Sequence, residues 1–87
     1  MKHRDINQKL TVSAREPFHI YYDGPANLVS AQNQVGKFDI LPGHADFFSV
    51  MTPGDVTIET DNGPINFQIS SGVITVRSDE AQLFVNF

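Results

Sequence analysis

A chain of 87 residues has room for one domain, and its formal net charge of −4 is opposite in sign to the basic surplus that nucleic-acid-binding surfaces carry. Hydrophobic residues make up 40% of the chain, and the lack of cysteine excludes disulfides and cysteine-based zinc sites. Its apolar runs are too short for a transmembrane helix, so we expect membrane contact only through an embedded partner. Seven phenylalanines and two tyrosines predict a core of aromatic and β-branched side chains.

From the start of the chain, residues 1–8 are polar and without period, and we expect a flexible arm there, followed by one domain over residues 9–87. Apolar and polar residues then alternate, as in Leu10-Thr-Val-Ser-Ala14 and Ile65-Asn-Phe-Gln-Ile69. Successive side chains of a strand face opposite sides, so each such run predicts a half-buried strand. The predicted strands are 9–14, 17–23, 26–33, 37–40, 46–51, 55–60, 64–70, 72–77 and 80–86. No window shows helical spacing, so we expect almost no helix.

Turn signals separate these runs, among them Asp23-Gly24-Pro25, Pro53-Gly54 and Ser78-Asp79. Asn62-Gly63 is the strongest, because a type I′ hairpin needs positive φ at both central residues. Many short strands with regular turns favour a sandwich or a barrel. The predicted fold class is all-β, a two-sheet antiparallel β-sandwich of about nine to ten strands.

Residues 36–44 interrupt the alternation, with adjacent Ile40 and Leu41 followed by a Pro-Gly corner and His44. We expect a strand that leaves its sheet and turns sharply, with His44 at the tip. Three interpretations of His44 remain open: a corner histidine bonded to nearby backbone, a contact residue for a protein partner, or a catalytic or metal-binding group.

Catalysis has the least support, because a general acid–base needs a partner group and a pocket, and a metal needs converging ligands. His3, His19 and His44 are spread over a tail, a strand and a corner, and no nucleophile elbow, phosphate loop or zinc-protease motif is present. We therefore predict no catalytic, cofactor-binding or metal-binding residues.

Some aromatic residues fall on faces that alternation predicts to be polar. Phe84 and Tyr21 do so, and one of Phe47 and Phe48 must point away from the core. Together they would form an apolar patch of the kind that marks a protein interface.

The stretch Gly36-Lys-Phe-Asp-Ile-Leu-Pro-Gly-His-Ala45 resembles the motif Gly-Glu-Phe-Gly-Ile-Leu-Pro-Gly-His-Ala of the F-type ATP synthase epsilon subunit. Tyr22-Asp23-Gly24, Pro53-Gly54 and Ser70-Ser71-Gly72-Val73 also resemble the family, and the likeness covers about residues 9–87. Asp39 and Ser71 stand where the family has Gly, which predicts backbone without positive φ at both positions.

The resemblance implies the N-terminal sandwich domain of epsilon, with two five-stranded sheets. It also implies a non-catalytic subunit of the rotating central stalk that joins the gamma subunit to the membrane c-ring in proton-coupled ATP synthesis. The domain would then lie on the cytoplasmic face of the bacterial inner membrane and reach the membrane only through the c-ring. The expected partner-contact residues are Gly36, Lys37, Phe38, Pro42, Gly43 and His44.

Lys37 stands where the family usually has a carboxylate that faces the c-ring loops, so the charge there is reversed. The family's C-terminal helical hairpin has no counterpart in this sequence, so its inhibitory action and its ATP site are not carried over. The alternative function is a free-standing β-sandwich binding module with an epsilon-like fold.

Overall fold

A computed structural model describes residues 8–87, which form nine strands and no helix. The predicted arm therefore lies outside the described residues, apart from Gln8. The strands are β1 (Leu10–Glu16), β2 (His19–Ala26), β3 (Leu28–Asn33), β4 (Gly36–Ile40), β5 (Phe47–Met51), β6 (Gly54–Thr60), β7 (Gly63–Ile69), β8 (Gly72–Arg77) and β9 (Glu80–Val85). All nine predicted strands are confirmed, with ends that shift by up to three residues.

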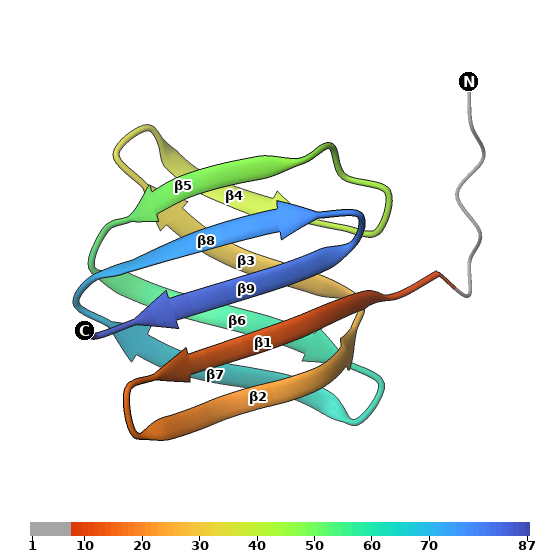
Figure 1. The fold of residues 1–87 in the computed structure, drawn as a ribbon, viewed down its shortest axis with the longest axis horizontal. Coiled ribbons are helices and arrows are strands. Elements are labelled where there is room, and N and C mark those ends of the chain that lie inside the picture. Colours follow the sequence, from red (N-terminus) through yellow and green to blue (C-terminus); the bar gives the residue numbers. More distant parts are fainter. Residues whose placement is uncertain (1–7) are drawn as a thin grey trace.

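The strands form two stacked sheets, as the alternation predicted (Figure 1). The first sheet has the order β2-β1-β9-β8-β5 and the second has the order β4-β3-β6-β7. The all-β sandwich is thus confirmed, although the sheets have five and four strands. One pair is also not antiparallel: β9 runs parallel to β1, which makes the first sheet mixed. Alternation within a strand carries no information about the direction of its neighbour, so this pair was not predicted.

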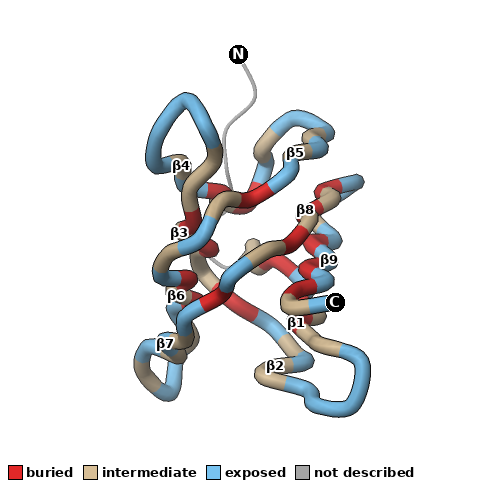
Figure 2. The backbone as a smooth tube through the Cα atoms, turned by 90° about the vertical axis from the view of Figure 1, so that its left-hand side faces the viewer, coloured by how far each residue is buried: buried red, intermediate tan, exposed pale blue. Residues whose placement is uncertain are grey.

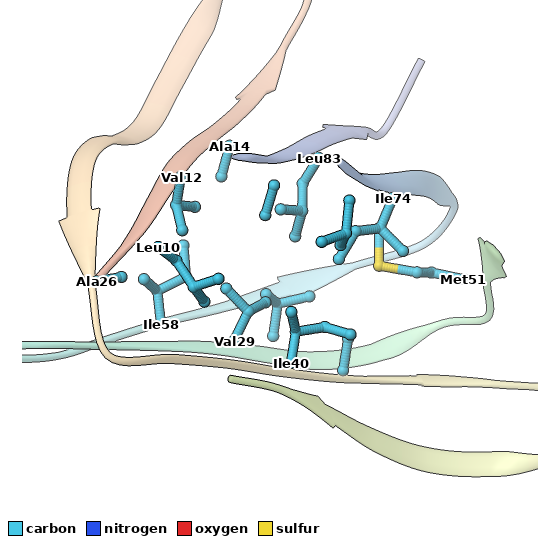
Figure 3. Close-up of a cluster of buried hydrophobic side chains, with 14 of the residues drawn as sticks. Leu10, Val12, Ala14, Ala26, Val29, Ile40, Met51, Ile58, Ile74 and Leu83 are labelled. Carbon is cyan, nitrogen blue, oxygen red and sulfur yellow. The ribbon is translucent and has the colours of Figure 1, made fainter. Parts of the chain in front are cut away.

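The core fills the space between the sheets, where the buried segments of both layers face each other (Figure 2). The first sheet contributes Leu10, Val12, Ile74 and Leu83 to this core, and the second sheet contributes Val29, Ile40 and Ile58 (Figure 3). Every buried hydrophobic residue is aliphatic or methionine. The prediction of a partly aromatic core was therefore wrong, because the aromatic side chains lie around the core and on the surface.

Two predicted turns differ from the structure. Asp23, Gly24 and Pro25 lie inside β2, where Gly24 pairs with Val12 and Pro25 with Thr11. Proline is tolerated there because β2 is an edge strand with one unpaired side.

The hairpin at residues 60–63 is present, but its central residues are Asp61 and Asn62, because Thr60 pairs with Gly63. Positive φ occurs only at Gly63 in this turn, at 109°. This fits a type I turn followed by a left-handed glycine, rather than the predicted type I′ turn. The type I′ pattern occurs at Ser78 and Asp79 instead, with φ of 50° and 64° between the paired residues Arg77 and Glu80.

Candidate partner-binding surface

The segment predicted to leave the sheet begins as an ordinary edge strand. β4 pairs with β3 over its whole length, with Lys37 opposite Gln32 and Ile40 opposite Val29. Lys37 and Asp39 are exposed on one face, while Phe38 is half-buried and Ile40 fully buried on the other. The chain turns only after Ile40, so Gly36 and Lys37 lie at one end of β4 and the Pro42–His44 turn follows the other end.

The turn at residues 41–46 is compact, and its residues differ in exposure. Pro42 is buried and Gly43 is exposed, with φ of +84° that favours glycine. The His44 amide donates a hydrogen bond to the Leu41 carbonyl at 3.1 Å, and its Nδ1 lies 2.7 Å from the Ala45 carbonyl oxygen. The histidine is therefore held by its own turn, which supports the interpretation of a backbone-bonded corner residue.

Aromatic packing fixes the same turn against β5. The His44 ring meets the Phe47 ring edge-on at a centroid distance of 5.6 Å, and Phe38 packs on Phe47 at 5.2 Å. Phe38 also packs against the core. Among the predicted contact residues, Gly36, Lys37 and Gly43 are exposed and His44 is half-exposed, whereas Phe38 and Pro42 mainly support the fold.

A polar cluster on the surface joins Asp61 to Asn27 and Lys9. In the part of the chain that the structure describes, no three histidine, aspartate or glutamate side chains are grouped to hold a metal ion. Within residues 8–87 the pKa is shifted at Asp61, whose carboxylate accepts hydrogen bonds of 2.9 Å from Asn27 and from Lys9. The Asn27 hydrogen bond, followed by the bond and charge of Lys9, lowers the pKa of Asp61 below its ordinary value of 3.8. This surface cluster joins three segments and lines a surface cavity of about 410 Å³.

The outer face of the five-stranded sheet carries a row of apolar residues near one end. The strand register places Val50, Val73, Phe84, Arg15 and Ile20 opposite one another in that order. This apolar row, interrupted by Arg15 on β1, crosses all five strands, which lie side by side at the front of Figure 1. Val50 is 62% exposed and Phe84 44% exposed, and Phe48 beside the row is 65% exposed.

The apolar patch expected from the sequence is therefore partly present. Phe48 and Phe84 share the outer face, and Phe47 is the inward residue of its pair. Tyr21 is not part of it, because its ring stacks on Phe67 at 4.1 Å. Val50, Val73 and Ile20 were missed, since only the register between strands aligns them.

Comparison with known proteins decides the family. The family model described as "ATP synthase, Delta/Epsilon chain, beta-sandwich domain" matches residues 9–87. The chain belongs to this family. Its relatives include the ATP synthase epsilon chain of Ruthia magnifica subsp. Calyptogena magnifica, which is 37% identical over 84% of this chain and 51% of the relative. The epsilon chain of Xanthomonas oryzae pv. oryzae (strain MAFF 311018) is 34% identical over 93% of this chain and 56% of the relative.

Solved structures carry a similar fold. A chain of the Euglena gracilis mitochondrial ATP synthase, from a structure of OSCP, F1 and c-ring, matches with a TM-score of 0.83 at 16% identity, over 97% of this chain and 54% of that one. A chain from the central stalk and c-ring of the Tetrahymena thermophila mitochondrial enzyme matches with a TM-score of 0.77 at 22% identity, over 92% and 65%. At these identities the likeness establishes the fold. The chain spans about half the length of the curated relatives that it matches. No helix within residues 8–87 is long and apolar enough to cross a membrane.

Proposed function

We propose that this chain acts as the sandwich part of a non-catalytic central-stalk subunit, which joins the gamma subunit to the c-ring of an F-type ATP synthase. The observation that carries the proposal is the delta/epsilon family match over residues 9–87. The expected location is the cytoplasmic face of the bacterial inner membrane, with membrane contact through the c-ring alone. The epsilon chains of bacterial relatives support this location.

The two ends of β4 suit two different contacts. Lys37 is exposed at the end where β4 begins, and we assign it to the polar loops of the c-ring. The Pro42–His44 turn lies beyond the other end, and we assign Gly43 and His44 to the gamma subunit, together with the apolar row. Apolar side chains exposed on a sheet face suit a protein partner, because burying them releases ordered water.

The test is binding of the chain to purified gamma subunit and to purified c-ring. We expect His44→Ala to weaken gamma binding by about tenfold or more if it lies near the centre of the contact. Lys37→Glu should alter c-ring association and its salt dependence instead, because a charge at an interface rim acts mainly on the association rate. Arg77→Glu is the matched control: it makes the same change of charge on an exposed residue of the other sheet.

Failure of the unmodified chain to bind either partner would contradict the stalk role and would favour the free-standing binding module. If the unmodified chain, His44→Ala and Lys37→Glu all bind equally well, the stalk role still stands. The assignment of His44 and Lys37 as contact residues would then be wrong. Phe38→Ala is not a test of contact, since its half-buried ring supports Phe47 and its loss would act through stability.

A further inference from the structure

Two aspartates connect the Pro42–His44 turn to the hairpin between β8 and β9. The Gly43 amide donates a hydrogen bond of 2.8 Å to the Asp79 carboxylate. In the opposite direction, the Ser78 amide donates a hydrogen bond of 3.2 Å to the Asp46 carboxylate. Each loop thus supplies one carboxylate and one backbone donor to the other, across more than thirty residues of sequence.

Asp79 also binds the beginning of the first strand. Its second carboxylate oxygen accepts a hydrogen bond from the side-chain amide of Gln8, and its carbonyl accepts one of 2.8 Å from the Thr11 amide. One residue in the β8–β9 turn therefore holds the corner after β4 and the entry to β1 at the same end of the sandwich.

Both connected loops depend on left-handed backbone. Gly43 has φ of +84°, and Ser78 and Asp79 have φ of 50° and 64°. Glycine adopts such a conformation readily, whereas for Ser78 and Asp79 it is sparsely populated in a free chain and persists where the surroundings over-determine it. A hydrogen bond to a charged acceptor is stronger than one between neutral groups, so a carboxylate is an effective means of fixing an exposed amide such as that of Gly43.

We propose that Asp79 and Asp46 are positioning residues, which hold the Pro42–His44 turn in the conformation that the gamma subunit binds. Neither carboxylate needs to touch the partner. A turn that is already ordered loses less conformational freedom on binding, which improves affinity without any new contact. The inference rests on the proposed function for its partner, whereas the clamp itself is a property of the isolated chain.

The first arm of the test measures hydrogen exchange of the Gly43 amide in the isolated chain. Asp79→Gly is the informative variant, because glycine suits positive φ and a type I′ turn while the carboxylate is lost. We expect exchange at Gly43 to become about tenfold faster, with the amides of the central strand β9 unchanged. Asp46→Ala should likewise speed exchange at Ser78.

The control for this arm is Asp55→Ala, which removes an exposed carboxylate from β6 in the other sheet. It should leave the exchange of both amides as in the unmodified chain. Unchanged exchange at Gly43 in Asp79→Gly, or equal acceleration in Asp55→Ala, would overturn the clamp.

The second arm measures gamma binding. We expect Asp79→Gly to bind about threefold to tenfold more weakly than the unmodified chain, with Asp55→Ala unaffected. In a chain that already carries His44→Ala, adding Asp79→Gly should weaken gamma binding little further, because the side chain that Asp79 positions is already gone. The positioning role would be overturned if His44→Ala weakens gamma binding while Asp79→Gly binds gamma with full affinity. If His44→Ala binds gamma normally, the contact assigned to the turn fails, and hydrogen exchange alone then decides the clamp.

Discussion

Single polar residues on this sandwich connect segments that are distant in sequence. Lys9, just before β1, contacts both Asn27 and Asp61, and Asn27 also donates to Asp61. The carboxylate of Asp61 accepts hydrogen bonds from both Asn27 and Lys9, so folding favours its deprotonated form and lowers its pKa. The pH dependence follows from this sign. The stability that the cluster contributes is fully present above the ordinary pKa of 3.8 and is lost as the pH falls through the lower pKa of the folded state.

The first prediction concerns the cause of this shift. Replacing Asn27 with alanine should raise the pKa of Asp61 toward 3.8, because the Asn27 hydrogen bond is the largest contribution. Titration of the Asp61 carboxyl carbon by nuclear magnetic resonance measures it. Asn66→Ala, an exposed asparagine that bonds Thr57 instead, should leave the pKa of Asp61 unchanged. An unchanged pKa of Asp61 in Asn27→Ala would contradict this assignment.

Sequence reasoning at the residue scale succeeded where the local backbone decides. Asp39 and Ser71 lack positive φ, as their replacement of glycine predicted. Exposure was harder to predict, because it depends on neighbours in space. Phe38 and Pro42 belong to the recognised motif, yet Phe38 packs against the core and Phe47, and Pro42 is buried.

Among the elements, aromatic pairs close the two open sides of the sandwich. Tyr21 of β2 stacks on Phe67 of β7, with centroids 4.1 Å apart and planes at 5°. On the opposite side, Phe38 of β4 meets Phe47 of β5. These four strands are the edges of the two sheets, and Figure 1 shows them at the bottom and the top of the molecule. The aromatic residues thus bridge the two sheets at their edge strands, and aliphatic side chains fill the core between the sheets.

The second prediction tests the bridge between β2 and β7. A double-mutant cycle with Tyr21→Leu and Phe67→Leu should give a coupling energy of about 0.5–1.5 kcal/mol, since stacked rings stabilise each other beyond their buried area. The free energies of unfolding come from denaturant titration. The matched control is a cycle of Tyr21→Leu with Phe47→Leu, whose ring lies at the other side, and it should show no coupling. A coupling energy near zero for the first pair would mean that each ring acts through the core alone.

Alternation within the chain predicted the existence and approximate ends of all nine strands, because one face of each strand is buried. The same signal cannot predict how strands pair. The parallel contact between β1 and β9 joins the two ends of the domain, and the apolar row exists only in the register of five strands. Turn chemistry was misassigned for a similar reason: pairing of Thr60 with Gly63 determines which residues form the loop.

At the scale of the whole molecule, the proposed partner contacts fall on three regions: the end with Lys37, the end with the Pro42–His44 turn, and the outer face with the apolar row. The row reaches the Lys37 end, because Val50 lines a surface cavity together with Asn33 and Val35. The sequence motif includes the first two as one continuous stretch, whereas β4 separates them. Three residue steps of a strand from Lys37 to Ile40 span about 10 Å, and the chain continues beyond Ile40 before it reaches His44. Two partners could therefore be bound at once without competing for the same residues.

The third prediction follows from this separation. Measured on the assembled complex of gamma and c-ring, the effects of Lys37→Glu and His44→Ala on binding free energy should add to within about 0.3–0.5 kcal/mol, because residues this far apart rarely couple. Raised salt should change the effect of Lys37→Glu and leave that of His44→Ala nearly constant, since only the first alters a charge. By contrast, His44→Ala and Asp79→Gly should be strongly non-additive, because both act on one turn. Strong coupling between Lys37 and His44 would instead indicate that the two residues contact the same partner surface, and that β4 shifts as a unit when the complex forms.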